Sequence, residues 1–178
     1  MKTNSYELFS DKLKGLLELD DDPIAIFLLP SRPAGVKRVN EPMAACSMWG
    51  KAKKEVFYAV GKDHYPCPVG VEVLGCELTP GRKAAKERVY ARLEEFGVRT
   101  HEATVRMGEG TPKIPVGKID NAMYGPLKRA QTDPDVVLLI CDPNQAMKLA
   151  EASGREDGAA PHALLNMPGC ATVSSIYL

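Results

Sequence analysis

Two short, wholly apolar runs constrain this chain more than any other feature of its sequence. They are Ile24–Leu29 and residues 136–141, and they lie far apart along the chain. Runs of about four to eight apolar residues are typical of strands that are buried on both faces. Neither run approaches the roughly 20 apolar residues that a helix needs to cross a bilayer. We therefore expect two interior strands of a sheet and no membrane span.

Amphipathic helices are predicted around these strands. Residues 5–19 carry one helical stripe of apolar side chains, made of Phe9, Leu13, Leu16 and Leu17. Asp142 is expected to cap a helix that begins at Pro143, with Gln145 completing a capping box. In full, we expect strands at residues 24–29, 56–60, 98–106, 136–141 and 171–177, and helices at residues 5–19, 43–54, 69–76, 80–96 and 143–153.

This pattern predicts the fold class. A chain of 178 residues has the size of one domain. Because helices and strands are both expected, we predict a single domain over residues 1–178 of the α+β or α/β class. Its core is expected to be a mixed sheet of about five strands flanked by helices.

Charge and composition exclude several classes of function. Lys plus Arg and Asp plus Glu number 23 each, so there is no excess positive charge to neutralise nucleic-acid phosphates. The N-terminus lacks the charged start and apolar stretch of a secretory signal. We therefore expect a cytoplasmic protein that binds neither nucleic acid nor membrane. Its expected partners are a small molecule or a redox partner protein.

Five cysteines are the main carriers of chemistry in the sequence. Their odd number and the absence of a CxxC pair argue against a disulfide framework and a local zinc motif. Cys46 and Cys67 lie at the starts of expected helices, and Cys170 lies in a Pro-Gly-Cys turn. N–H groups at helix starts stabilise the thiolate, which is the form of cysteine that binds metals. Cys76 and Cys141 are expected to be buried as small apolar side chains.

Residues 61–70 gather polar and aromatic side chains in a stretch rich in Pro and Gly. His64 lies three residues before Cys67, a spacing that allows both side chains to face one ion. Tyr65 lies in the same stretch, and Trp49 lies three residues after Cys46. Both aromatic rings are candidates to line a cofactor site. Each residue also has a simpler structural interpretation, as a surface histidine or as an aromatic ring in the core.

Several spaced groups of residues carry a family resemblance. They are Ala45-Cys46-Ser47-Met48-Trp49, Asp63-His64 followed by Cys67-Pro68-Val69-Gly70, Gly125-Pro126-Leu127, Pro143 with Gln145-Ala146-Met147, and Cys170-Ala171. In these motifs and their order the chain resembles the domain of unknown function 169 family of archaea and anaerobic bacteria, over most of residues 10–172. The resemblance implies that Cys170 matches a further cysteine of the family. It also implies a chain that is shorter at its C-terminus than many relatives.

The leading functional hypothesis is a metal centre built from thiolates that are distant in sequence. We expect Cys46, Cys67 and Cys170 to converge on an iron–sulfur cluster or on one soft metal ion such as zinc. His64 or an external group would supply the fourth ligand. Three cysteines with one different or open position is a known ligand set for such centres. The protein would then have a redox or accessory role.

Two other interpretations remain open at this point. In the first, a metal-free accessory module binds a small molecule or a partner protein through residues 64–70, and Cys67 is at most a reactive thiol. In the second, Cys67 is the nucleophile of an enzyme and His64 is its base. The sequence names no convincing residue to orient that base, although Asp63 is adjacent to it.

Overall fold

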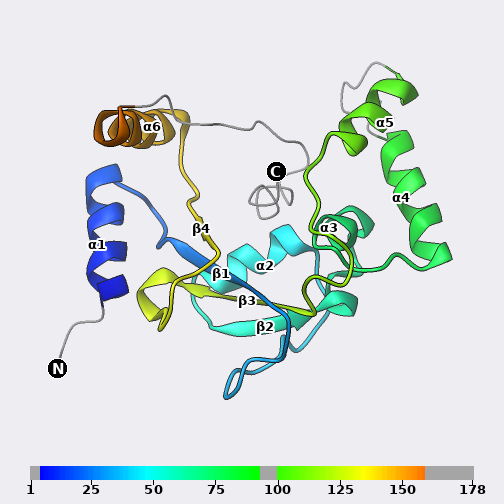
Figure 1. Cartoon of the computed structure of the whole chain (residues 1–178), viewed down its shortest axis with the longest axis horizontal. Helices are drawn as coiled ribbons and strands as arrows, with labels where there is room; N and C mark the ends of the chain where they lie inside the picture. The colour runs from blue at the N-terminus through cyan, green and yellow to red at the C-terminus, as the bar shows by residue number, and fades with distance from the viewer. Residues whose placement is uncertain (1–4, 93–99, 159–178) are drawn as a thin grey trace.

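The structure, a computed structural model, describes residues 5–92 and 100–158. Its elements in chain order are α1 (Ser5–Leu17), β1 (Ile24–Leu29), α2 (Ala45–Ala52), β2 (Phe57–Val60), the 3₁₀ helix η1 (Gly61–His64), α3 (Pro68–Val73), α4 (Pro80–Arg92), α5 (His101–Glu109), β3 (Asn121–Pro126), the 3₁₀ helix η3 (Leu127–Arg129), β4 (Val136–Leu138) and α6 (Pro143–Asp157), as Figure 1 shows. The fold is of the α+β class. Within these residues, no helix combines the length and the apolar composition that crossing a membrane requires.

The strands form one sheet in the order β2-β3-β1-β4. β1 lies at its centre and pairs along its whole length with β3, so that Ile24 lies opposite Pro126 and Leu29 opposite Asn121. It pairs with β4 on its other side. Because all three neighbouring pairs are antiparallel, the expected mixed sheet of about five strands is corrected to four antiparallel strands in the described part of the chain.

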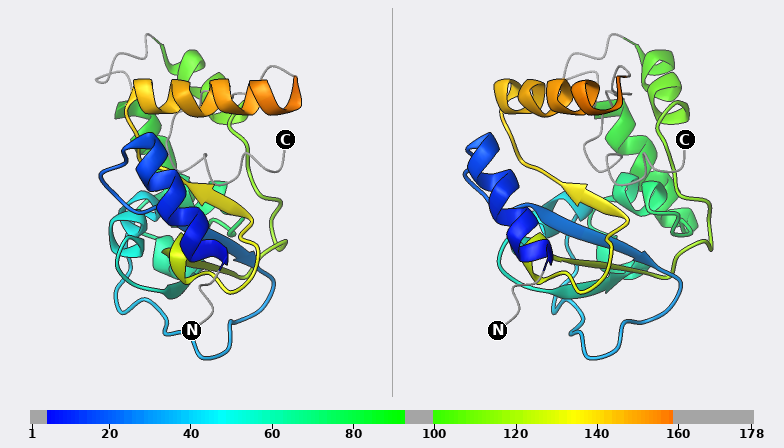
Figure 2. Two further views of the ribbon diagram at one scale, coloured as in Figure 1. Left: turned by 90° about the vertical axis from the view of Figure 1, so that its left-hand side faces the viewer. Right: turned by 60° about the vertical axis from the view of Figure 1, so that its left-hand side comes forward.

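Elements pack on both faces of this sheet, which explains why β1 is apolar throughout. Ile24 and the alternate residues that follow it join the larger core, with Met48 of α2 and Val73 of α3. The intervening residues Ala25 and Phe27 belong to a second apolar cluster on the other face, where α1 and η3 lie (Figure 2). A strand that is buried on both faces cannot carry polar residues at every second position.

The buried face of α1 differs from the predicted stripe. Leu17 is buried and Leu13 is half-buried, as expected, but Phe9 is 49% exposed and Leu16 is 78% exposed. The face turned to the sheet includes the buried Ser10 instead. A small polar residue such as Ser10 can lie on the buried face of a helix where the helix packs closely on its neighbour. The apolar pattern therefore identified Leu13 and Leu17 of this face but not Ser10.

Residues 98–106, predicted to form a strand, are helical from His101 onward in α5. Thr100 caps this helix, and its side-chain oxygen accepts a hydrogen bond from the N–H of Ala103. A threonine at this position, followed by an acidic residue in the first turn, is a helix-start signal that outweighs the β-branched residues further along. The strand predicted at residues 171–177 lies outside the described residues.

The sequence-based interpretation missed β3. Its residues Asn121–Pro126 include a glycine and a proline, which are both rare in strands. Gly125 is there because a Cβ atom at this position would lie 2.8 Å from Cγ2 of Val56. Pro126 is the last residue of the strand, where a missing N–H is tolerated.

The start of α6 agrees with the sequence-based prediction. Asp142 is the N-cap, its side chain accepts a hydrogen bond from the N–H of Gln145, and the Gln145 side chain accepts one from the N–H of Asp142. Pro143 is the first helical residue, as predicted. β4, by contrast, ends at Leu138 and is shorter than the predicted strand.

Candidate functional site at the starts of α2 and α3

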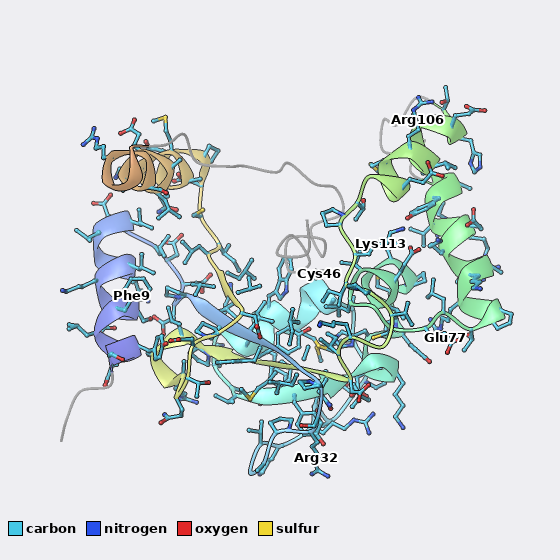
Figure 3. All side chains as sticks on the ribbon, in the orientation of Figure 1. Phe9, Arg32, Cys46, Glu77, Arg106 and Lys113 are labelled. Carbon is cyan, nitrogen blue, oxygen red and sulfur yellow. The ribbon has the colours of Figure 1, made fainter. Side chains whose placement is uncertain are left out.

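Cys46 is the second residue of α2 (Figure 3). The buried residues Ala45, Met48 and Ala52 form the side of α2 that packs on the sheet. Cys46 is exposed, because it projects from a different side of the helix. Its thiol is therefore accessible to solvent, to a metal ion or to an oxidant.

Cys67 occupies the N-cap position of α3, and Pro68 follows it as the first helical residue. The predicted helix start is thus confirmed. The Cys67 side chain makes no capping hydrogen bond, is partly buried and packs against the larger core. Since the thiol is not used as a cap, it remains available for other chemistry.

Gly70 brings the starts of the two helices together. A Cβ atom at Gly70 would lie 3.2 Å from Cβ of Ala45 and 3.8 Å from Cβ of Cys67. Ala45, the residue directly before Cys46, therefore packs against the first turn of α3, the turn that Cys67 caps. A side chain at position 70 would separate α2 from α3, so the close approach of the two cysteine-bearing segments depends on a glycine here.

His64 is buried in the core beneath this region. It is 2% exposed, and each of its ring nitrogens has a hydrogen-bond partner, at 3.1 Å from Val60 O for Nδ1 and 3.1 Å from Tyr124 Oη for Nε2. A carbonyl oxygen can only accept, so Nδ1 carries the proton and Nε2 of the neutral ring accepts from the tyrosine hydroxyl. Burial lowers the pKa of His64 from 6.5 to about 4, although the hydrogen bond to Val60 opposes the shift.

In this arrangement neither ring nitrogen of His64 is free to bind a metal ion or to take a proton from Cys67. The adjacent Asp63 does not orient the histidine either, because its carboxylate is bound to Arg38. The Arg38 side chain donates from Nε at 2.8 Å and from Nη2 at 2.5 Å, and the N–H of Val60 donates to the same carboxylate at 2.9 Å. The geometry therefore gives no support to a Cys67–His64–Asp63 catalytic arrangement.

The buried histidine predicts a specific pH dependence of stability. The unfolded chain binds a proton at His64 near pH 6.5, whereas the folded protein does so only near pH 4, so unfolding takes up a proton between these values. The free energy of unfolding should therefore fall by roughly 2 kcal/mol between pH 7 and pH 5. Urea unfolding at a series of pH values measures this slope.

The control for this prediction is His64→Gln, which should be less stable than the parent at pH 7 but should lack the slope between pH 7 and pH 5. Carboxylates with a lowered pKa, such as Asp22 and Asp63, change the free energy of unfolding only at lower pH, where the unfolded chain begins to bind protons at these groups. An unchanged slope in His64→Gln would show that the pH dependence has another origin.

The two aromatic candidates differ in their surroundings. Trp49 is partly buried and packs against the larger core, and its indole Nε1 is buried with no hydrogen-bond partner among the described residues. Tyr65 is covered by Arg82, whose guanidinium carbon lies 4.9 Å from the ring centroid and which also donates a hydrogen bond to the Tyr65 carbonyl. Tyr65 thus links the end of η1 to the start of α4.

The remaining cysteines take different positions. Cys76 is partly buried, and burial raises the pKa of its thiol to about 11, which agrees with a structural role. Cys141, expected in the core, is exposed, because β4 ends three residues before it. Cys170 lies outside the described residues. Within residues 5–92 and 100–158, no three or more His, Cys, Asp or Glu side chains are arranged to hold a metal ion.

Two residues that sequence patterns did not identify bind side chains of residues 60–67. Arg38 binds Asp63, and Tyr124 binds His64. Arg38 lies in an irregular segment 25 residues before its partner Asp63, and Tyr124 lies 60 residues after His64. The only signal in the sequence was the apolar alternation of Ala122 and Tyr124 in β3, which faces the larger core.

Comparisons with known proteins agree with the resemblance found in the motifs. A family model described as DUF169, Uncharacterised ArCR, matches residues 12–177. The uncharacterized protein MJ0308 of Methanocaldococcus jannaschii is 26% identical over 157 residues, which are 85% of this chain and 66% of that protein. This chain thus spans just under two thirds of the length of its curated relative. No solved structure matches it significantly. On the extent of the family match, the chain belongs to the domain of unknown function 169 family.

Proposed function

We propose that the protein binds an iron–sulfur cluster or a soft metal ion such as zinc through Cys46 and Cys67, with Cys170 as a third thiolate ligand. One observation carries the proposal: the segments that bear Cys46 and Cys67 meet at Gly70, where a Cβ atom would lie 3.2 Å from Cβ of Ala45. These cysteines lie 21 residues apart in the sequence. The contact between the segments that carry them is therefore a product of the fold, and it supports the proposal that the two thiols act together.

The chemistry of the two thiols fits this role. Neither is in a disulfide, Cys46 is exposed and Cys67 is partly exposed. The Cys67 side chain also makes no capping hydrogen bond to α3. Thiolates are the preferred ligands of Cu(I), zinc and iron–sulfur clusters, and N–H groups at helix starts help to stabilise negative charge near them.

The fourth ligand in this proposal is an external group, and not His64. Both ring nitrogens of His64 are engaged in the core, and freeing one of them would leave a buried polar group without a partner. A position filled by water, by a small molecule or by a partner protein is typical of centres that exchange ligands. This arrangement supports a redox or accessory role.

Anaerobic purification, followed by metal and sulfide analysis and visible absorption spectroscopy, tests the proposal. We expect about one metal ion or one cluster per chain, and loss of most of it in Cys46→Ser, Cys67→Ser and Cys170→Ser. Serine is a preferred N-cap residue, so Cys67→Ser removes the thiol without weakening the start of α3. Cys141→Ser is the matched control, because Cys141 is also an exposed thiol but is not part of the proposed site.

A second measurement separates the proposal from its main alternative, a metal-free accessory module with a reactive thiol. The purified protein is treated with iron and sulfide, or with zinc, under anaerobic conditions. Stoichiometric uptake that depends on Cys46 and Cys67 supports the metal centre. Absence of uptake, or equal uptake by Cys141→Ser and Cys67→Ser, would reject it in favour of the metal-free module.

A further inference from the structure

A cavity lies outside the cysteine site, between the end of α3, the start of α4 and the segment that leads from α5 to β3. Its volume is about 410 Å³, within the range of roughly 300 to 1,000 Å³ that is typical of small-molecule sites. Figure 3 labels residues from two of its walls: Glu77 lies on the segment between α3 and α4, and Lys113 lies on the segment after α5. Cys46, Cys67 and His64 are not among its lining residues.

The walls of the cavity are held together by backbone contacts. The N–H of Ile114 donates to the carbonyl of Val73 at 3.0 Å, which fixes the segment after α5 to the last residue of α3. Gly75 adopts a φ of +69°, and a Cβ atom there would lie 2.7 Å from the carbonyl oxygen of Ile114. The cavity is therefore a formed feature of the fold and not a gap between independent loops.

Most of the surface of the cavity is apolar. Leu78, Ile114, Pro115 and Val116 all contribute, and Ile114 is buried while Val116 is 72% exposed at the edge. The Cys76 thiol also lines the cavity. Since burial raises its pKa to about 11, the thiol is neutral near pH 7 and adds a soft, uncharged surface.

Two lysines and two glutamates line the cavity, and Lys86, which binds one of these glutamates from outside the lining, gives the group one positive charge in excess. Glu72 binds two lysines through a single oxygen: Oε1 accepts from Lys86 at 3.0 Å and from Lys113 at 3.2 Å. Its Oε2 is buried and has no hydrogen-bond partner among the described residues. Two ammonium groups thus share one carboxylate, which leaves one positive charge without a counter-charge in this cluster.

A further cation lies at the edge of the cavity. Lys83 of α4 is exposed and lines the cavity. The ion pairs formed among residues 5–92 and 100–158 do not include it. Lys113 uses one of its three N–H donors on Glu72 and has two left. Glu77, which also lines the cavity, repels negative charge on a ligand, and it therefore disfavours a dianion more than a monoanion.

We propose that this cavity binds a small organic acid with one carboxylate and an apolar body. The carboxylate would be bound by the ammonium groups of Lys83 and Lys113, and the apolar body would pack against Leu78, Ile114 and Val116. A mostly apolar site with a few convergent charged groups is the usual design of a binding site for such molecules. The proposal does not depend on metal binding at Cys46 and Cys67.

The test is a titration of the whole protein with 4-methylpentanoate and with 3-phenylpropanoate, followed by amide chemical shifts or by calorimetry. We expect saturable binding of at least one acid, and at least about tenfold weaker binding of the matching neutral amide, because the amide has no charge to offer the lysines. Lys83→Met should weaken binding of the acid by about the same factor. Val116→Trp should abolish it, because the indole would fill the cavity from its edge.

Lys118→Met is the matched control, since Lys118 is an exposed lysine that does not line the cavity, and it should bind the acid like the parent. Thermal unfolding checks that each variant is folded. Failure of both acids to bind, binding that survives Val116→Trp in a folded protein, or equal binding of acid and amide would each overturn the proposal.

Discussion

Gly75→Ala is expected to lower the free energy of unfolding by about 4 kcal/mol. Gly75 has a φ of +69°, a conformation that costs an L residue roughly 1 to 2 kcal/mol. The added Cβ atom would also lie 2.7 Å from the carbonyl oxygen of Ile114 and 2.9 Å from that of Pro115. Both are backbone atoms, and relieving the clash means breaking the hydrogen bond between Ile114 and Val73, which adds a few kcal/mol.

The matched control is Gly35→Ala. Gly35 has nearly the same backbone conformation, with a φ of +71°, but a Cβ atom there would meet nothing within 4 Å. The free energy of unfolding of Gly35→Ala should fall by about 1 kcal/mol, because only the cost of the backbone conformation remains. Urea unfolding of both variants separates the two contributions. Equal losses in the two variants would mean that the segment after α5 moves freely away from α3.

The second large effect is expected from Arg38→Met, which removes the partner of a buried carboxylate. Asp63 is 3% exposed. Burial alone would raise the pKa of Asp63, but hydrogen bonds from Arg38 and from the N–H of Val60 hold it below its usual value. Without Arg38, the bond from the N–H of Val60 is the one that remains to this carboxylate among the described residues. Removing one partner of a fully buried pair typically costs about 3 to 5 kcal/mol, but the Arg38 side chain is 37% exposed and solvent screens part of this interaction. We therefore expect a loss of about 2 to 3 kcal/mol at pH 7.

Two further variants test the origin of this loss. Lys37→Met changes an exposed cation next to Arg38 and should cost less than about 0.5 kcal/mol. The double variant Arg38→Met, Asp63→Asn should regain part of the stability lost in Arg38→Met, because the unpaired buried charge is then absent. If the double variant is as unstable as the sum of its single changes, the two side chains do not interact as described.

Local signals in the sequence predicted the local structure well. The capping box at Asp142 and the Cys67-Pro68 start of α3 involve residues at most three positions apart, so they are encoded where they act. The apolar run of β1 predicted a strand buried on both faces, and the two core clusters bear this out. Signals of this kind require no knowledge of the rest of the fold.

The errors arise where long-range packing outweighs local preference. β3 is a strand because it pairs with β1 and β2, and its glycine and proline concealed this from the sequence. The exposed Phe9 and Leu16 of α1 show that an apolar stripe need not be the buried one.

The candidate site was predictable only in part for the same reason. The positions of Cys46 and Cys67 at helix starts followed from neighbouring residues. The roles of His64 and Asp63 did not, because their partners Tyr124 and Arg38 lie on other segments. Whether Cys46, Cys67 and Cys170 come together stays a prediction.

The order of the strands has a consequence for how the chain is made. Among the described residues, β1 pairs with β3 and β4, and β2 pairs with β3 apart from one isolated bridge between Tyr58 and Arg38. No two of these strands can therefore pair before residue 121 has been synthesised. At roughly 5 to 20 residues per second, β1 leaves the ribosome several seconds before its partners. During that interval a strand with two apolar faces is open to solvent, and nascent-chain chaperones are the factors suited to shield it.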